Sequence, residues 1–418
     1  GAVSATSASS NIGGFCGNEF DSGDGAINCF WDKTTSGQTT SADNETGLTT
    51  AEMKDIIFFT DENTTGLTTA WDFVSNPNDD VANNNYWDMD QEGTVNSGYP
   101  ILSWQDGADN IIPFSGGNGS SGNPYQIATT DNLIELSNLS SLWDKYFIQT
   151  ANISFNEDET QVDWDGSGTA GPTEGFSPIG NSTTKFTGSF NGQNYTISNL
   201  HINRSSTDYI GLFGTIQGAT INKLGVTNVE ITGKSYVGGL IGSITNSSVE
   251  NSFTTGVVAG IDNVGGFAGS SENSSTVGNS YSRANVTRSS GTGTNFGGFG
   301  GYNAATITDC YSTGLVYESV GVSWSSNDKG FVGNNNSGTY NNNFFDSDAS
   351  GQTTGTGATG KTTAKMKDFN TFTDENNAGL TTAWDFVTNP NDDAANNDYW
   401  DMDQLGTVNN DYPIFSWQ

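Results

Sequence analysis

Apolar and polar residues alternate in four short stretches along the middle of the chain. The stretches read TINKLGVTNVEI, SVENSFTTGVV, TVGNSYSRANV and TITDCYSTGLV, at 220–231, 248–258, 276–286 and 306–316. In each of them Val, Ile, Leu, Phe or Tyr recurs among polar residues, chiefly Thr, Ser and Asn. A period of two predicts a β-strand with one buried face.

A glycine-rich phrase precedes each stretch. It reads YIGLFG, YVGGLIG, NVGGFAG and NFGGFGG, and the related GFVG follows later. Measured from the apolar residue before the glycines, Ile210, Val237, Val264 and Phe296 are 27, 27 and 32 residues apart. A fixed period of this size indicates repeated supersecondary units, none of which can bury its apolar face alone.

Together these features predict an all-β fold, a parallel β-helix or β-solenoid built of coils of about 27–33 residues, with at most short helices. Each coil would supply two or three short strands, and successive coils would stack at about 4.8 Å, the spacing between strands of a sheet. The glycine pair would mark one corner, where the backbone either adopts positive φ or approaches the next coil closely.

A larger repeat divides the chain into parts. The segment Trp71–Gln105 returns as Trp384–Gln418 with 28 of 35 positions identical. We therefore expect residues 1–106 to be the C-terminal half of a repeat module, 107–346 to be solenoid coils, and 347–418 to be a module-ending cap that duplicates 33–105. Beginning within a module suggests a longer tandem array, or a subunit whose partial module is completed by a neighbour.

The duplicated endings are rich in aromatic residues. Six of the ten tryptophans fall there: Trp71, Trp87, Trp104, Trp384, Trp400 and Trp417. The end of a solenoid needs an apolar cover, so we interpret them as structural caps. A platform for sugar binding is the alternative. The Thr-rich segments TTAEMKD and TTAKMKD within the endings are predicted to form one short helix with a Thr cap.

The phrases VGGLIG, VGGFAG and FGGFGG resemble the GLUG motif of large bacterial and archaeal surface proteins. The stretches FSGGNGSSGNPYQIATTDNLIELSNL at 114–139, FTGSFNGQNYTISNL at 186–200 and the final NNDYPIFSWQ resemble the opening, an early coil and the ending of such modules. The resemblance implies a secreted adhesin or surface-fibre protein with a β-helical body. It supplies no catalytic residues.

The formal net charge is -34, from 47 acidic and 13 basic residues. Such a field repels nucleic acids and anionic membranes, so neither is expected as a partner, and divalent cations are the natural counter-ions. The sequence contains no run of 18 apolar residues, so no membrane insertion is expected.

Aspartates in two settings are weak candidates for binding Ca²⁺, which prefers carboxylate and carbonyl oxygens. One is the stretch DWDGSG, and the other is an acidic segment present in both endings. A solvated acidic loop is the alternative in each setting. The residues are Asp163 and Asp165 in the first setting, and Asp79, Asp80, Asp88, Asp90, Asp392, Asp393, Asp401 and Asp403 in the second.

Two of the three cysteines, Cys16 and Cys29, lie in GFCGNEFDSGDGAINCFWD. The related stretch GFVGNNNSGTYNNNFFD has Val332 and Asn343 in their places, so both cysteines are replaced together. This joint absence predicts a disulfide between Cys16 and Cys29, and with it an extracellular location. Two unrelated thiols are the alternative.

Candidate chemistry is sparse. The single histidine, His201, lies in the strand-like YTISNLHINR and has no partner for a triad or a zinc site. GTGATGKT at 355–362 matches the phosphate-binding loop pattern, but polar FFDSDASGQTT precedes it where a buried strand is required. We expect no catalytic activity. Ca²⁺ is the only cofactor that the sequence suggests.

These features predict an extracellular structural repeat protein, part of a cell-surface fibre, stalk or adhesin. Its partners would be copies of itself or adjacent modules, joined end to end. A glycan-binding adhesin module that contacts surface glycans is one alternative. A β-helical enzyme that cleaves polysaccharides through paired carboxylates is another.

Overall fold

The computed structural model describes residues 15, 28–41, 45–61, 63–71, 73, 87–89, 96–102, 114–155, 174–317, 328–387 and 399–418. The chain forms two compact units, residues 1–112 and residues 113–418. No helix within the described ranges combines the length and the apolar character that crossing a bilayer requires.

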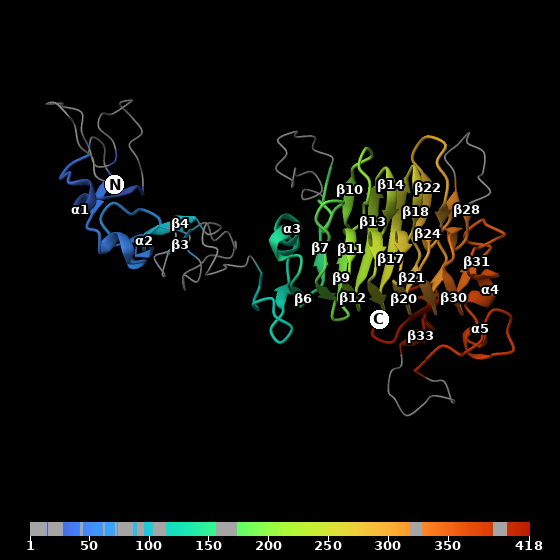
Figure 1. Cartoon of the computed structure of the whole chain (residues 1–418). Coiled ribbons are helices and arrows are strands. Elements are labelled where there is room, and N and C mark those ends of the chain that lie inside the picture. Colours follow the sequence, from blue (N-terminus) through green and yellow to red (C-terminus); the bar gives the residue numbers. More distant parts are fainter. Residues whose placement is uncertain are drawn as a thin grey trace. The chain divides into compact units, whose positions relative to one another are not determined.

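The larger unit is a parallel β-solenoid, which confirms the predicted fold class (Figure 1). One of its sheets stacks a single strand from each of five successive coils, and every pairing in it is parallel. Its strands are β11 (Phe213–Gln217), β15 (Ile241–Thr245), β19 (Ala268–Glu272), β24 (Gly300–Asn303) and β29 (Val332–Asn335).

Three further sheets complete the coils. The eight-stranded sheet contains β5 (Tyr125–Ile127), β6 (Tyr146–Gln149), β8 (Ser189–Asn191), β12 (Thr220–Asn222), β16 (Ser248–Glu250), β20 (Thr276–Gly278), β25 (Thr306–Thr308) and β30 (Thr339–Asn341). The four-stranded sheet contains β14 (Ser235–Gly238), β18 (Asp262–Gly265), β23 (Phe296–Gly297) and β28 (Asp328–Lys329).

The eleven-stranded sheet carries the site described below. Its strands are β7 (Ile153–Ser154), β9 (Thr196–Ser198), β10 (His201–Asn203), β13 (Gly225–Thr232), β17 (Phe253–Gly260), β21 (Tyr281–Ser282), β22 (Asn285–Arg288), β26 (Tyr311–Ser312), β27 (Val316–Tyr317), β31 (Phe344–Asp346) and β32 (Thr359–Lys361).

The glycine-rich phrases stack directly on one another, as the repeat predicts. Val237 pairs with Val264, and Val264 pairs with Phe296. Inside the column, aliphatic side chains from equivalent strands lie in line, and Val249 pairs with Val277 and is fully buried. Each coil therefore buries these aliphatic side chains against the coils next to it.

Close approach, and not positive φ, explains the glycine pair. A Cβ atom at Gly265 would lie 2.1 Å from the carbonyl oxygen of Ala268 and 2.6 Å from the Cα atom of Gly300 in the next coil. The left-handed backbone falls at the first residue of each phrase, two positions before the glycine pair, at Tyr236, Asn263 and Asn295, with φ of 58°, 53° and 71°. The corner thus combines a left-handed residue with two glycines that admit the neighbouring backbone.

Within the described residues helices are few and short, as expected. In the larger unit they are α3 (Thr130–Asn138), the 3₁₀ turn η2 (Ser140–Leu142), α4 (Thr363–Met366) and α5 (Asn370–Thr373). Thr129 and Asn132 form a capping box at the start of α3, which buries Leu133 and Leu136. Figure 1 places α3 at the end of the stack where β6 and β7 lie.

The smaller unit repeats the last elements of the larger one. It contains β1 (Phe30–Asp32), α1 (Lys33–Ser36), β2 (Thr46–Leu48), the 3₁₀ turn η1 (Glu52–Lys54), α2 (Ile57–Thr60), β3 (Trp87–Met89) and β4 (Pro100–Leu102). The parallel pair β1–β2 corresponds to β31–β32. The antiparallel pair β3–β4 corresponds to β33 (Trp400–Met402) and β34 (Pro413–Phe415).

Candidate functional site

A column of aromatic rings runs along one face of the eleven-stranded sheet. Phe253, Tyr281, Tyr311 and Phe344 occupy equivalent positions on β17, β21, β26 and β31. The rings of Phe253 and Tyr281 are stacked 4.8 Å apart, and those of Tyr281 and Tyr311 are 4.9 Å apart. These distances equal the spacing between strands, so the backbone register sets the stacking. We call these four residues the aromatic ladder.

The module ending covers this ladder. Trp384 and Trp400 stack 4.7 Å apart, and their rings lie 6.2 Å and 5.9 Å from the ring of Tyr311. Phe415 continues the stack 4.9 Å from Trp400. Trp384 is 1% exposed and Trp400 is fully buried. In this copy the indole faces are therefore used for capping and are not open to a sugar.

Polar groups of the ladder are satisfied by the cap. The hydroxyl of Tyr311 donates to the carbonyl of Pro413 and accepts from Nδ2 of Asn409 at 2.7 Å. The hydroxyl of Tyr281 donates to Oε1 of Gln418 at 2.9 Å. A buried tyrosine needs such partners, because an unpaired hydroxyl away from water costs about 1–3 kcal/mol.

A buried carboxylate joins the coils to the cap. Asp346, at the end of β31, is fully buried and accepts hydrogen bonds from the hydroxyls of Tyr412 at 2.6 Å and Thr363 at 3.0 Å. The backbone N–H groups of Asp348 and Ala349 donate to the same carboxylate. Burial, together with the hydrogen bond to Asp346, raises the pKa of Tyr412 well above its usual range.

The smaller unit repeats this arrangement around Asp32. Its carboxylate accepts from the hydroxyls of Tyr99 at 2.6 Å and Thr50 at 2.7 Å, and from the backbone of Thr34 and Thr35. Burial alone would raise the pKa of Asp32, but the hydrogen bonds from Tyr99, Thr35 and Thr50 hold it well below its usual range. The folded protein therefore stabilises the charged carboxylate of Asp32.

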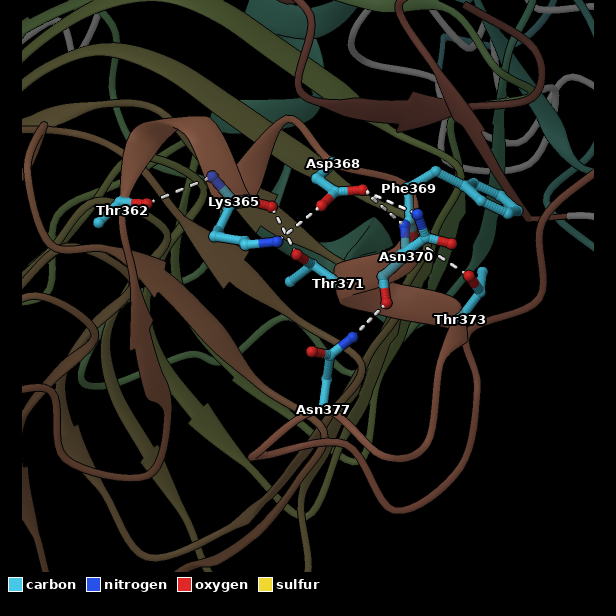
Figure 2. Close-up of polar contacts among 8 residues, drawn as sticks. All are labelled: Thr362, Lys365, Asp368, Phe369, Asn370, Thr371, Thr373 and Asn377. Carbon is cyan, nitrogen blue, oxygen red and sulfur yellow. Dashed lines mark hydrogen bonds and ion pairs between the residues drawn. The ribbon is translucent and has the colours of Figure 1, made fainter.

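Two short helices in the cap are held by local polar contacts (Figure 2). Nζ of Lys365 lies 3.0 Å from the carboxylate of Asp368, which also accepts from the backbone N–H of Asn370 at 3.1 Å. The hydroxyl of Thr371 donates to the carbonyl of Lys365 at 2.7 Å. Thr362 accepts from the N–H of Lys365, so α4 begins with the predicted Thr cap.

The stretch that matches a phosphate-binding loop belongs to this region. Its Gly360 and Lys361 lie on β32, and its final Thr362 precedes a helix of four residues. Nζ of Lys361 lies 5.5 Å from the ring centre of Phe344. The stretch therefore forms part of the cap, and the long helix that follows a phosphate loop is absent from this described region.

Two of the ten calcium candidates, Asp401 and Asp403, lie in the described part of the ending with their side chains placed. The carboxylate of Asp403 is 4% exposed and accepts from the backbone N–H groups of Thr407, Val408 and Asn409. Burial opposes the charge, but these bonds lower the pKa of Asp403. The carboxylate of Asp401 accepts from the N–H of Met402 at 2.7 Å.

The described residues contain no group of three or more acidic, His or Cys side chains arranged to hold a metal ion. Asp88 lies on β3. The other candidates fall outside the described residues, and calcium binding there stays a prediction: Asp79, Asp80, Asp90, Asp163, Asp165, Asp392 and Asp393.

Cys29 immediately precedes β1, whereas Cys16 falls outside the described residues, so their pairing stays a prediction. Burial, with a contribution from Glu45, raises the pKa of the Cys29 thiol. His201 lies on β10, and its Nδ1 is 3.5 Å from the carboxylate of Glu230 on the adjacent strand β13. This contact does not belong to the aromatic cap. The side chain of Glu230 is exposed and that of His201 is half-buried.

Sequence reasoning found the cap but not the surface it covers. The signal was present, because four successive coils carry an aromatic residue at the same place, in NSF, NSY, DCY and NNF. The preceding Asn251, Asn279, Asp309 and Asn342 all have positive φ, from 42° to 54°. A left-handed corner therefore precedes each residue of the aromatic ladder by two positions.

Comparison with family models finds no match. Among curated proteins, halomucin from Haloquadratum walsbyi is 35% identical over 175 residues, which are 41% of this chain and 2% of halomucin. A Gly-rich membrane protein from Evansella cellulosilytica is 34% identical over 152 residues, 34% of this chain and 16% of the relative.

The immunoglobulin A1 protease of Streptococcus pneumoniae is 34% identical over 100 residues, which are 24% of this chain and 5% of the protease. A crystal structure of a Bacteroides ovatus protein described as an immunoglobulin A1 protease aligns with 73% of this chain and 96% of its own, at 20% identity and a TM-score of 0.49. The chain thus spans between 2% and 16% of the length of these curated relatives.

Proposed function

We propose that this protein is an extracellular structural repeat protein of the GLUG type, part of a cell-surface fibre, stalk or adhesin. The observation that carries the proposal is the axial stacking of parallel coils beneath an aromatic cap that occurs twice in the chain. Backbone hydrogen bonds along the axis resist extension, and each cap covers apolar surface that a stack of coils would otherwise expose.

The curated relatives support a place at the cell surface. One is named halomucin and another is named a Gly-rich membrane protein. The proposed disulfide between Cys16 and Cys29 would agree with an oxidising environment outside the cell.

We further propose that the chain acts without catalysis. The match to immunoglobulin A1 proteases covers 5% of those proteins, which fits a shared repeat segment. In the described residues the most deeply bound carboxylates, Asp32, Asp346 and Asp403, are occupied by donors from their own units. We assign these carboxylates a structural role, because donors of their own units already bind their oxygens.

Negative-stain microscopy and limited proteolysis of the whole chain test this proposal. We expect elongated particles whose larger unit resists protease, and modules that associate end to end. A matched chain without residues 1–105 should lose the association and keep the elongated unit. Round particles that are digested as readily as an unfolded protein would contradict the structural role. Release of reducing ends from polysaccharides would favour the enzyme alternative.

A further inference from the structure

The cap in the smaller unit is built like the cap in the larger one. Trp71 and Trp87 stack 4.4 Å apart, as Trp384 and Trp400 do at 4.7 Å. Nε1 of Trp71 donates to the carbonyl of Asn28 at 3.0 Å, and Nε1 of Trp384 makes the equivalent bond at 3.1 Å. The two caps therefore share these contacts among their described residues.

What differs is how far the equivalent residues are covered. Trp400 is fully buried and Asn409 is 1% exposed, whereas Trp87 is half-buried and Asn96 is exposed. A cavity of about 410 Å³ opens beside the aromatic core of the smaller unit. Its lining includes Trp71, Trp87, Asn96 and Pro100. We call these four residues the socket.

Each socket residue has a counterpart that touches Tyr311 in the larger unit. The counterparts of Trp71 and Trp87 lie 6.2 Å and 5.9 Å from the ring of Tyr311. The counterparts of Asn96 and Pro100 bind its hydroxyl. Nδ2 of Asn96 already donates to the carbonyl of Pro100 at 2.9 Å, as its counterpart does in the filled copy. The cavity thus lies where the larger unit holds a tyrosine.

The backbone beside the socket supports the same conclusion. Strand β31 has two parallel neighbours, β32 on one side and β26, which carries Tyr311, on the other. Strand β1 pairs in the same way with β2 and with no second strand among the described residues. Its other edge is positioned to accept one more parallel strand, and an added strand gives both backbone hydrogen bonds and side-chain specificity.

We propose that the smaller unit is a docking site for a solenoid coil that lacks a cap of its own. A strand with the sequence Tyr-Ser, as in β26, adds in parallel to β1 and places its tyrosine in the socket. The tyrosine hydroxyl bonds to the carbonyl of Pro100 and to Asn96, and its ring lies against Trp71 and Trp87. This inference rests on the proposed structural role and names the surface through which modules join.

The occupant is a coil without a cap, because the aromatic ladder of the larger unit is already covered by the cap of that unit. Tyr281 and Tyr311 are 1% and 0% exposed beneath their own cap. A second copy of this chain could offer them only after removing that cap. A coil that ends a stack without a cap presents the same aromatic strand with its edge free.

A labelled peptide with the sequence of residues 306–316, with Cys310→Ser to prevent oxidation, tests the site. Fluorescence anisotropy measures its binding to the whole chain. We expect binding that weakens at least tenfold when the peptide carries Tyr311→Ala, since buried aromatic anchors dominate such interfaces. Hydrogen exchange at the Phe30 amide should slow on binding, because the equivalent amide of Phe344 donates to the carbonyl of Cys310.

Matched variants of the chain locate the binding. Trp87→Leu should weaken peptide binding at least tenfold, and Trp400→Leu, at the same place in the filled copy, should leave it unchanged. If circular dichroism shows that Trp87→Leu does not fold, Asn96→Ala replaces it. This change removes an exposed side chain and should weaken binding about fivefold by loss of one hydrogen bond.

Three results would overturn the docking site: equal binding of the Tyr311→Ala peptide, no binding up to millimolar peptide, or displacement of the peptide from the socket by a methyl glycoside. The last result would favour a glycan site. Elongated particles without peptide binding would leave the structural role standing and reject the socket alone. Round particles that bind the peptide would reject the structural role and leave the socket standing.

Discussion

The hydroxyl of Tyr412 lies 2.6 Å from the carboxylate of Asp346, and Tyr99 lies at the same 2.6 Å from Asp32 in the other copy of the cap. Each pair joins the last residue of a strand at the start of the cap to a tyrosine some 66 residues later. The same contact in both copies shows that it belongs to the design of the cap and not to the coils beneath it.

We expect Tyr412→Phe to lower the free energy of unfolding of the larger unit by about 1.5–3 kcal/mol, because a buried carboxylate loses a donor. Tyr99→Phe should cost less. Asp32 keeps two other hydroxyl donors, from Thr35 and Thr50, whereas Asp346 keeps only the one from Thr363 among the described side chains. Denaturant titrations followed by tryptophan fluorescence measure both changes. A larger loss at Tyr99 would contradict this account.

The glycine pair gives a second prediction. Gly265→Ala should destabilise the solenoid by about 1–3 kcal/mol, because its new methyl group meets rigid backbone from the next coil. Gly278→Ala, on β20, is the matched control, since its nearest neighbour would be 3.8 Å away. The control should be neutral or stabilising by up to about 1 kcal/mol, through a less flexible unfolded chain. Thermal unfolding of both variants shows whether the loss comes from a steric clash at Gly265 or from replacing any solenoid glycine by alanine.

Asp309 gives a prediction that depends on pH. Burial raises its pKa from 3.8 to about 6, although the hydrogen bond from Asn342 works in the opposite direction. The folded protein therefore disfavours the charged form. The resulting loss of stability is complete above pH 6 and vanishes below about pH 4.

Asp309→Asn should raise the free energy of unfolding by about 1–3 kcal/mol at pH 7, with the gain shrinking as the pH falls from 6 to 4. Asparagine suits the site, because Asn251 and Asn279 hold the same left-handed corner in other coils. Urea titrations at several pH values measure the difference from the unmodified chain. The exposed Asp144→Asn is the control, and an equal gain there, or a gain that grows in acid, would contradict the assignment.

The predicted pairing of Cys16 with Cys29 has a direct chemical test. Peptide mapping without reduction should find one linked pair containing these two residues, with Cys310 as a thiol because it is fully buried. Cys29→Val should shorten the life of residues 1–112 against protease, as should reduction. Alkylation of both Cys16 and Cys29 in the native, unreduced protein would reject the pairing.

The solenoid could be predicted from sequence because its signal is local and repeated. Val237, Val264 and Phe296 each follow the same turn and precede the same glycines, so a constant spacing in the sequence becomes a constant register in space. The left-handed Asn263 and Asn295 that begin the phrase were also predictable in principle, since asparagine tolerates a left-handed backbone. Tyr236 was not, because a bulky side chain rarely adopts a left-handed backbone, and its φ is 58°. Its ring stacks on that of Tyr209, 4.9 Å away in the preceding coil.

The contact between the cap and the ladder could not be predicted in the same way. Tyr311 and Trp400 are far apart in the sequence, and no period relates them. Their contact depends on where a long, irregular ending returns to the sheet. The sequence could show that both copies of the ending need apolar surface to cover, but not which face of a coil supplies it.

The parallel register of every coil gives the column a direction, since its first and last coils expose different edges. A twofold axis can join only like ends of two such columns, so a contact between the first coil of one column and the last coil of another joins unlike surfaces. Contacts of that kind do not close on themselves unless they bend into a ring. The length of an assembly would then depend on how many units are supplied, and a capped terminus would be what stops its growth.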